Sequence, residues 1–325
     1  MIKTLEIKNF KSIKDLKLDL RRINIFIGEP NTGKSNILET VGIFSFGGYG
    51  RVLNLESKNF VRFERVSNLF YDEDLEQEIT ISFDGYLLNL KFQKGNFEGS
   101  LQAESTSYPH AFSGSYEDIS SVILGALRPF KFYRFSRRES FPSRESDFLL
   151  PPSGDNLLSL LLTNKEPRSI ANQFFSSFGL RLGLRPQESK IELIKQLEDI
   201  IISYPYSVAS ETLQGVVFHF AAVLSNKDSI LAFEEPEAHA FPYYTKFLAE
   251  EIALDNRGNQ YLISTHNPFF LEPLIEKAKE EELNVFITYL ENYETKVKPL
   301  TKEQKERVLD FGGDVFFNLE KLLEG

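Results

Sequence analysis

The first thirty residues contain short segments in which apolar and polar side chains alternate or apolar side chains dominate. Residues 4–10 and 15–20 alternate with a period of two, which predicts two half-buried β-strands. Residues 23–27 are almost all apolar and are followed by Gly28, so they predict a buried central strand. A helix is expected from about Ser35, because the apolar residues that follow recur at helical spacing.

The pattern changes twice further along the chain. Residues 60–105 alternate short apolar runs with Gly, Asn or Asp turns, which indicates an antiparallel β region. Residues 150–206 look helical: Asp155 and Asn156 are placed to cap a helix, and residues 191–201 carry apolar side chains at helical spacing. From residue 207 onward helices and strands alternate, which predicts an α/β fold with a parallel sheet. The elements expected there cover residues 213–224, 230–233, 243–253 and 261–264.

Composition limits the classes of function. The 325 residues are 42% hydrophobic and 26% charged, which is typical of one large or two medium globular domains. No apolar run approaches the length of a membrane span and the first residues do not resemble a signal peptide, so we expect a cytoplasmic protein without a membrane partner. The absence of cysteine excludes disulfides, thiolate metal sites and a cysteine nucleophile. A net charge of -10 argues against a broad nucleic-acid-binding surface but allows one local basic patch.

A glycine-rich loop lies between the expected central strand and the helix that follows it. Its residues match the phosphate-loop pattern G-x-x-x-x-G-K-[ST], in which backbone N–H groups surround phosphates and the helix N-terminus favours negative charge. Lys34 would then reach the β- and γ-phosphates, and the Ser35 hydroxyl would bind Mg²⁺. The alternative, a glycine turn with an exposed lysine, accounts less well for the flanking strand and helix. The loop comprises Gly28, Glu29, Pro30, Asn31, Thr32, Gly33, Lys34 and Ser35.

The apolar run at 230–233 ends in carboxylates, as does the strand that helps to hold Mg²⁺ in P-loop enzymes. Burying charge beside a core strand is costly unless something pairs with it. We interpret Glu234 as the carboxylate on the metal side, acting through water, and Glu235 as the residue that polarises the water attacking the γ-phosphate. The alternative is that Glu234, Glu235 and Glu237 cap the helix after Pro236, where acidic residues suit the helix dipole.

These segments together resemble a known family. The opening TLEIKNFKSIKDLKLDL, the loop GEPNTGKSN and the later EEPEAHAFP are similar to ABC-type ATPase heads of the RecF, SMC (structural maintenance of chromosomes) and OLD (overcoming-lysogenization-defect) group. The similarity is greatest to the stand-alone members without a long coiled coil. The segment QYLISTHNP resembles the switch-histidine segment of that family. The resemblance extends to LLPPSGDNL, which leads into the helical lobe, and to the tail at 285–323.

The resemblance implies a fold and a function. The fold would be one P-loop NTPase domain, residues 1–325, with a β-rich ATP-binding lobe formed by residues 1–148 and 213–325 and a helical lobe at residues 149–212. The function would be Mg²⁺-dependent ATP hydrolysis, with ATP and Mg²⁺ as cofactors and a homodimer that encloses ATP at its interface. ATP-driven dimerisation would switch a DNA-associated complex in repair, chromosome organisation or phage defence.

The resemblance also assigns roles to single residues. Lys34, Glu235 and His266 would be catalytic, with His266 in contact with the γ-phosphate and the attacking water. Ser210, at a helix N-terminus, would face the ATP of the opposite subunit. Mg²⁺ would be held by Ser35 and Glu234, further nucleotide contacts would come from Lys11, Ser12 and Asn36, and Glu237 and His239 would lie near the dimer interface.

Departures from the family pattern leave a second function open. Glu211 follows Ser210 where a glycine is usual, so this segment fits an ordinary capped helix as well as a signature segment. Aspartate is commoner at the position of Glu234, although glutamate keeps the charge, and no glutamine loop is recognisable. The alternative function is an ATP-binding regulatory module that hydrolyses little or no ATP and acts through a partner protein. A subunit of a membrane transporter fits less well.

One basic stretch differs from the rest of this acidic chain. Residues 128–138 interleave cations with aromatic residues, a composition that can grip a nucleic-acid backbone and stack bases. The stretch is also consistent with a protein partner, or with a buried strand whose arginines pair with carboxylates. His219 is expected in the core, and no D-x-D cluster follows His266, so any nuclease activity would come from a partner. The cations of the stretch are Arg128, Lys131, Arg134, Arg137 and Arg138.

Overall fold

A mostly parallel sheet of six strands forms the centre of the fold. The computed structural model describes residues 1–142, 144–238 and 240–324, so His239 lies outside the described residues. The strand order is β16-β15-β3-β14-β13-β9, and neighbours are parallel except for the antiparallel pair β15 and β16. The expected central strand and the later parallel strands are confirmed. The strands are β3 (Ile23–Gly28), β9 (Phe130–Tyr133), β13 (Ile230–Glu234), β14 (Gln260–Ser264), β15 (Leu283–Glu291) and β16 (Glu294–Pro299).

The N-terminal part of the chain builds a second, antiparallel sheet of seven strands in the order β2-β1-β4-β5-β6-β7-β8. Its first two strands and its antiparallel region follow from the period-two alternation and are confirmed. The start of the predicted region, residues 60–78, differs from the prediction, because it contains two short 3-10 helices and the next strand begins only at Ile79. The strands are β1 (Thr4–Phe10), β2 (Ile13–Asp19), β4 (Ile79–Phe83), β5 (Tyr86–Gln93), β6 (Asn96–Ala103), β7 (Thr106–Gly114) and β8 (Ile119–Ser121).

Helix α1 (Lys34–Leu53) lies between these two sheets. It packs against β9, β13 and β14 of the six-stranded sheet and against β8 of the seven-stranded sheet. A helix that is apolar on all sides is expected to be buried, and most residues of α1 are buried. Glycine lets a neighbouring segment come close, since a Cβ at Gly42 would lie 2.5 Å from the backbone oxygen of Phe60. The helix that leaves the phosphate loop is therefore held by both sheets.

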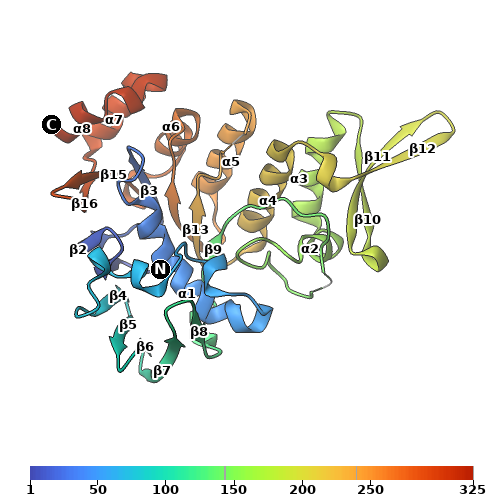
Figure 1. Ribbon diagram of the computed structural model, residues 1–325. Helices are drawn as coiled ribbons and strands as arrows, with labels where there is room; N and C mark the ends of the chain where they lie inside the picture. The colour runs from blue at the N-terminus through green and yellow to red at the C-terminus, as the bar shows by residue number, and fades with distance from the viewer. Residues whose placement is uncertain (143, 239, 325) are drawn as a thin grey trace.

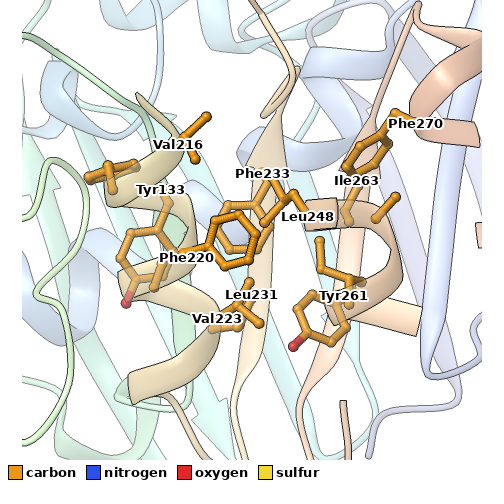
Figure 2. Packing of buried hydrophobic residues seen from close by; sticks show 14 of the residues in the cluster. Tyr133, Val216, Phe220, Val223, Leu231, Phe233, Leu248, Tyr261, Ile263 and Phe270 are labelled. Carbon is orange, nitrogen blue, oxygen red and sulfur yellow. The ribbon is translucent and has the colours of Figure 1, made fainter. Parts of the chain in front are cut away.

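Helices cover the other face of the six-stranded sheet (Figure 1). Side chains alternate along its strands: Tyr261 and Ile263 of β14 pack toward these helices, whereas Leu262 belongs to the core around α1. Figure 2 shows the helix-side cluster, with Phe220 of α4 among its members. His219 of α4 is buried as expected, and burial lowers its pKa to about 4. No helix among the described residues is both long and apolar enough to cross a membrane. The helices after α1 are α2 (Leu157–Thr163), α3 (Lys165–Ser176), α4 (Glu211–Ser225), α5 (Pro242–Leu254), α6 (Pro268–Lys277), α7 (Lys302–Phe311) and α8 (Leu319–Glu324).

A small three-stranded sheet replaces the second half of the segment that was expected to be helical. The prediction of a helix over residues 191–201 is wrong: its apolar residues also fit a period of two, and Ile191 and Leu193 pack inward from one strand. A turn at Glu198, whose φ is 48°, returns the chain as the next strand. Figure 1 shows this sheet at the end of the molecule far from α7 and α8. Its antiparallel strands are β10 (Arg181–Arg185), β11 (Lys190–Leu197) and β12 (Ile200–Pro205).

Replacing Gly42 by alanine tests the close packing of α1. Alanine favours a helix by about 1 kcal/mol over glycine. Its methyl group would nevertheless meet the backbone oxygen of Phe60, so we expect a net loss of about 1–3 kcal/mol in the free energy of unfolding, as is usual for overpacking. Urea unfolding followed by circular dichroism measures this change. Gly125→Ala is the matched control, because a Cβ there meets no described atom within 4 Å. Equal stability of the two variants would contradict this account.

Candidate nucleotide-binding site

The phosphate loop connects β3 to α1 and has the backbone shape that its glycines allow. Gly28 and Gly33 have positive φ angles of 147° and 97°. A Cβ at Gly33 would overlap the side chain of Thr295, and one at Gly28 would overlap the backbone oxygen of Thr288. Thr32 stabilises the loop from within, because its hydroxyl donates to a backbone oxygen three residues earlier at 2.8 Å. Strands β15 and β16 thus pack directly against the loop and leave room only for glycine.

Lys34 and Ser35 are the last two residues of the phosphate loop and the first two residues of α1. The Lys34 ammonium donates to the backbone oxygens of Gly28 and Glu29, at 2.9 and 2.7 Å. Burial lowers the pKa of Lys34 to about 8. The Ser35 hydroxyl donates to Oε1 of Glu234, at the end of β13. The first residues of the helix therefore reach both the loop and the acidic strand end.

The chain turns sharply where β13 ends. Glu235 has a φ of 45°, a strained conformation for a residue other than glycine, and its N–H donates to the backbone oxygen of Ser264 at 3.0 Å. The turn brings Glu235 to His266, which follows the neighbouring strand β14: Oε1 of Glu235 lies 3.3 Å from Nε2 of His266. The hydrogen bond from His266 is the main cause that holds the pKa of Glu235 below its ordinary value. The carboxylate is therefore ionised at neutral pH.

These groups line one cavity of about 690 Å³. The carboxyl ends of β3, β14 and β13 meet there because the three strands are parallel and adjacent. Ser12, from the turn after β1, reaches the same cavity and accepts a hydrogen bond from Nδ2 of Asn36 at 2.7 Å. The structure thus brings together the predicted phosphate loop, acidic strand end and histidine segment. The predicted residues at the cavity wall are Lys11, Ser12, Pro30, Asn31, Gly33, Lys34, Ser35, Asn36, Glu234, Glu235 and His266.

Ser210 lies outside this cavity. Its Oγ caps α4 by accepting the N–H of Leu213 at 3.3 Å, and Glu211 is the first residue of the helix. Ser210 borders a different, mainly apolar cleft of about 770 Å³, beside Phe175 and Phe241. Ser210 could therefore contact a nucleotide in such a cavity only if that cavity belongs to another subunit. The role of Ser210 in contacting the ATP of the opposite subunit stays a prediction.

Two residues of the site belong to no motif and were not predicted. Arg62, in the segment after α1, lines the cavity, and its guanidinium pairs with Glu234. The Nε of Arg62 also lies 2.9 Å from Oε1 of Glu39, which is fully buried in α1. The sequence could have indicated Glu39, because it is the only acidic residue of this mostly apolar helix and a buried carboxylate needs partners. Nothing in the local sequence identifies Arg62.

Glu237 connects the acidic turn to the histidine segment. Its side chain is buried, and Oε1 accepts hydrogen bonds from the Thr265 hydroxyl and from the His266 N–H, the latter at 3.3 Å. Oε2 has no hydrogen-bond partner among the described residues. Burial raises the pKa of Glu237 to about 7. The carboxyl group thus holds the two segments together inside the subunit.

The basic stretch 128–138 contains a buried strand. Lys131 lies in β9, and its ammonium donates to the side chains of Asn226 and Ser229, the latter at 3.0 Å. The same ammonium lies 3.5 Å from the ring centre of Phe148. Lys131 therefore fits the interpretation as a buried strand, and it is not available to a nucleic acid.

Two arginines of the same stretch are paired with carboxylates. Arg134 lies 3.4 Å from Oε1 of Glu39, and Arg138 lies 2.5 Å from Oδ1 of Asp155. Nη2 of Arg137 donates to the backbone oxygen of Ser207 at 2.6 Å. The stretch consequently forms no continuous basic strip, because four of its five cations are engaged within the subunit. Its exposed cations are Arg128 and Arg137.

Replacing Glu237 by glutamine is expected to change the pH dependence of stability. The pKa of the Glu237 carboxyl group is raised to about 7 in the folded protein. The folded protein therefore binds the proton of this carboxyl group more tightly than the unfolded chain does. The stability that the proton contributes is complete below the ordinary pKa of about 4.5 and is lost as the pH rises through about 7. Glu237→Gln should therefore gain stability relative to wild type between pH 5 and pH 8, by about 1.4 kcal/mol for each unit of pKa shift.

Urea unfolding of both proteins at several pH values measures this difference. Glu117→Gln, at an exposed position, serves as the control and should differ from wild type by a constant amount. A stability difference for Glu237→Gln that does not grow with pH would show that the carboxyl group is not held in a low-dielectric site.

Sequence comparison matches this chain to a family of ATPases and to a protein named as a nucleotide phosphatase, in agreement with the geometry of the cavity. Residues 1–205 match the model of the AAA ATPase domain family. A Helicobacter pylori protein named ATP/GTP phosphatase is 35% identical over 331 residues, which cover 87% of this chain and 90% of that protein. The Methanocaldococcus jannaschii protein MJECL10 is 31% identical over 145 residues, or 39% of this chain and 66% of that protein. The DNA replication and repair protein RecF of Lactococcus lactis is 49% identical over 41 residues, or 12% of this chain and 11% of RecF.

The same fold occurs among solved structures. The SMC head bound to the C-winged helix domain of ScpA matches 93% of this chain and 99% of that chain, with a TM-score of 0.54 at 15% sequence identity. The family model covers more than half of the chain, and the Helicobacter pylori relative aligns over nearly its whole length. This chain therefore belongs to the AAA ATPase domain family and has the fold of an SMC head domain.

Proposed function

We propose that this chain hydrolyses ATP with the help of Mg²⁺. One observation carries the proposal: a phosphate loop, an acidic strand end and a histidine from three segments line the same cavity. The cavity volume of about 690 Å³ lies in the range of sites that hold small-molecule ligands. The name of the Helicobacter pylori relative, ATP/GTP phosphatase, supports the same class of reaction.

The start of α1 would bind the triphosphate. Backbone N–H groups in the first turn of a helix have no partner within the helix, and they carry partial positive charge. The first turn of α1 contains no acidic residue that would oppose an anion. Lys34 adds a full positive charge whose present partners are neutral backbone oxygens. An anion at this position would therefore meet favourable charge from both the backbone and a side chain.

Ser35 and Glu234 have the chemistry that a magnesium ion requires. A hydroxyl and a carboxylate are oxygen ligands of the kind that Mg²⁺ prefers, and these two groups already contact each other. Among the described residues no group of three or more acidic or histidine side chains is arranged around a common point. The other ligands would therefore be phosphate oxygens and water, as is usual for this ion. When bound, the ion supplies neutralisation of charge on the phosphates.

Glu235 and His266 would act on the attacking water. An ionised Glu235 can accept a hydrogen bond from water and orient it toward the γ-phosphate. The Nε2 of His266, 3.3 Å from Oε1, holds this carboxylate in place. The sharp turn at Glu235 also fixes its backbone relative to β14. Orientation and charge stabilisation are the main contributions that P-loop enzymes make to phosphoryl transfer.

Replacing Glu235 by glutamine tests the hydrolysis. The variant keeps the size of the side chain but loses the ionised carboxylate, so we expect ATP turnover to fall by about 10²- to 10⁴-fold while ATP binding is retained. Release of inorganic phosphate and binding of a fluorescent ATP analogue measure the two effects. Lys34→Ala is the companion variant, and it should lose binding as well as turnover.

The outcome also separates the two functions considered for this chain. A wild-type protein that binds ATP but releases phosphate no faster than Glu235→Gln would be a regulatory ATP-binding module rather than an enzyme. The carboxylate of Glu211, at the start of α4, is the feature that favours that alternative.

We further propose that two copies of the chain enclose ATP between them. Ser210 caps the 15-residue helix α4, and its helix N-terminus does not reach the nucleotide cavity of its own subunit. A second subunit placed across the cavity could supply this helix N-terminus to the γ-phosphate. Glu211 would weaken the contact, because a carboxylate beside phosphate is unfavourable.

ATP-dependent dimerisation can be measured by sedimentation velocity in the Glu235→Gln background, where ATP is expected to persist. The protein should sediment as a dimer with ATP and Mg²⁺ and as a monomer with ADP. Adding Ser210→Arg should prevent dimerisation, whereas adding Glu211→Gln should strengthen it by about three- to tenfold, since like-charge repulsion is removed. Dimerisation that is unaffected by Ser210→Arg would exclude this helix from the interface.

The proposal that the dimer acts in a DNA-associated complex rests on relatives. RecF is named a DNA replication and repair protein, and the matching SMC head is bound to a domain of ScpA. The basic stretch 128–138 adds little support, since most of its cations are engaged within the subunit. Contact with DNA would therefore involve other surfaces or a partner protein, and a partner would also have to supply any nuclease activity.

A further inference from the structure

Glu39 in the second turn of α1 is a buried carboxylate on which three cations converge. The ammonium of Lys11 pairs with Oε2, while Nε of Arg62 lies 2.9 Å and Nη2 of Arg134 lies 3.4 Å from Oε1. The three cations come from three separate segments, after β1, after α1 and after β9. Only 1% of the Glu39 side chain is exposed. Glu39 is thus the common partner of groups that are distant in the chain.

The cations held by Glu39 form part of the nucleotide cavity. Lys11 and Arg62 both line the cavity, whereas Glu39 is fully buried behind them. Arg62 extends from Glu39 to Glu234, with which its Nη2 is paired. Glu39 therefore lies behind the cavity wall and pairs with the positive charges of two residues that line it.

The contacts fix backbone as well as side chains. Oε1 of Glu39 accepts the backbone N–H of Arg62 at 3.1 Å, and the Lys11 ammonium donates to the backbone oxygen of Arg62 at 2.6 Å. Without the carboxylate the three neighbouring cations would repel one another. A charged group that is already oriented loses less freedom when it binds a ligand, so it contributes more to affinity than a mobile one does.

We propose that Glu39 is a positioning residue that holds Lys11 and Arg62 at the cavity wall for contact with the phosphates of bound nucleotide. The inference rests on the proposed function, since it requires that the cavity bind a nucleoside triphosphate. It assigns no chemical step to Glu39, which acts only through the two cations. A purely structural role for the cluster would support the fold but leave nucleotide affinity unchanged.

The test is the affinity of the full-length protein for a fluorescent ATP analogue in the presence of Mg²⁺, measured for wild type and Glu39→Gln. Glutamine keeps the size of the side chain but removes the charge that holds the cations. We expect the dissociation constant to rise by about tenfold, the loss of one well-oriented charge contact. An unchanged dissociation constant would overturn the inference.

Asp255→Asn is the matched control. Asp255 is also a buried carboxylate, bonded to Arg257 at 2.8 Å and to the hydroxyl of Tyr261 at 2.6 Å, but it follows α5 and does not line the cavity. Its substitution should lower the melting temperature without altering the affinity for the ATP analogue. Equal losses of affinity in Asp255→Asn and Glu39→Gln would mean that general destabilisation explains both.

A double-mutant cycle identifies the route by which Glu39 acts. In a Lys11→Met/Arg62→Met background, Glu39→Gln should cause no further loss of affinity, because the cations that it positions are gone. A further tenfold loss in that background would overturn the inference. If Glu39→Gln does not fold, Glu39→Asp is tested in its place. Aspartate keeps the negative charge but moves it away from the cations by one methylene group. An affinity of Glu39→Asp equal to that of wild type would again overturn the inference.

The proposed function can fail separately. A wild-type protein that does not bind the ATP analogue at all would refute the nucleotide site itself, together with the role of Glu39. Wild-type binding that is equal to the binding of Glu39→Gln would refute only the role of Glu39.

Discussion

Opposite charges at the carboxyl edge of the central sheet neutralise one another across segments that are far apart in the chain. Glu39 and Glu234 together face Lys11, Arg62 and Arg134. Burying any of these groups alone would be costly, whereas a cluster with several hydrogen bonds offsets much of that cost. The cavity can therefore be lined with charged side chains although it is built on the end of an apolar sheet. The acidic strand end and the cavity wall both depend on these contacts.

Helix α1 connects this cluster to the rest of the fold. Its N-terminus closes the phosphate loop, its second turn carries Glu39, and its later turns are enclosed by both large sheets. The close approach at Gly42 leaves this helix little room to move sideways. The loop itself is bounded by Thr288 and Thr295 of β15 and β16, so its shape depends on strands from the other end of the chain. The packing of the two sheets and the geometry of the site are consequently parts of one structural unit.

The cavity of a single subunit contains groups suited to phosphate, metal and water, but the capped N-terminus of α4 lies beside another cleft. In the proposed dimer this arrangement would make ATP the bridge between subunits. Glu237 lies inside the subunit and links the acidic turn to the backbone N–H of His266. The position of the histidine thus depends on a buried carboxyl group whose pKa of about 7 reflects its low-dielectric surroundings.

The phosphate loop and the acidic strand end could be predicted because each lies in a short segment whose strand, turn and helix pattern is local. His266 was predicted from the resemblance of its segment to the switch-histidine segment of the family. Arg62 could not, since its carboxylate partners lie 23 and 172 positions away in the chain. The helix predicted at residues 191–201 was wrong because their apolar spacing fits two periods, and hydrogen bonds to β10 and β12 decide between them. The amino-acid sequence by itself determined most of the alternation of elements, the phosphate loop and the acidic strand end, because periodicity and turn chemistry act between neighbouring residues. Only the tertiary structure decided which charges meet and which strands pair, because these contacts form between segments that come together when the chain folds.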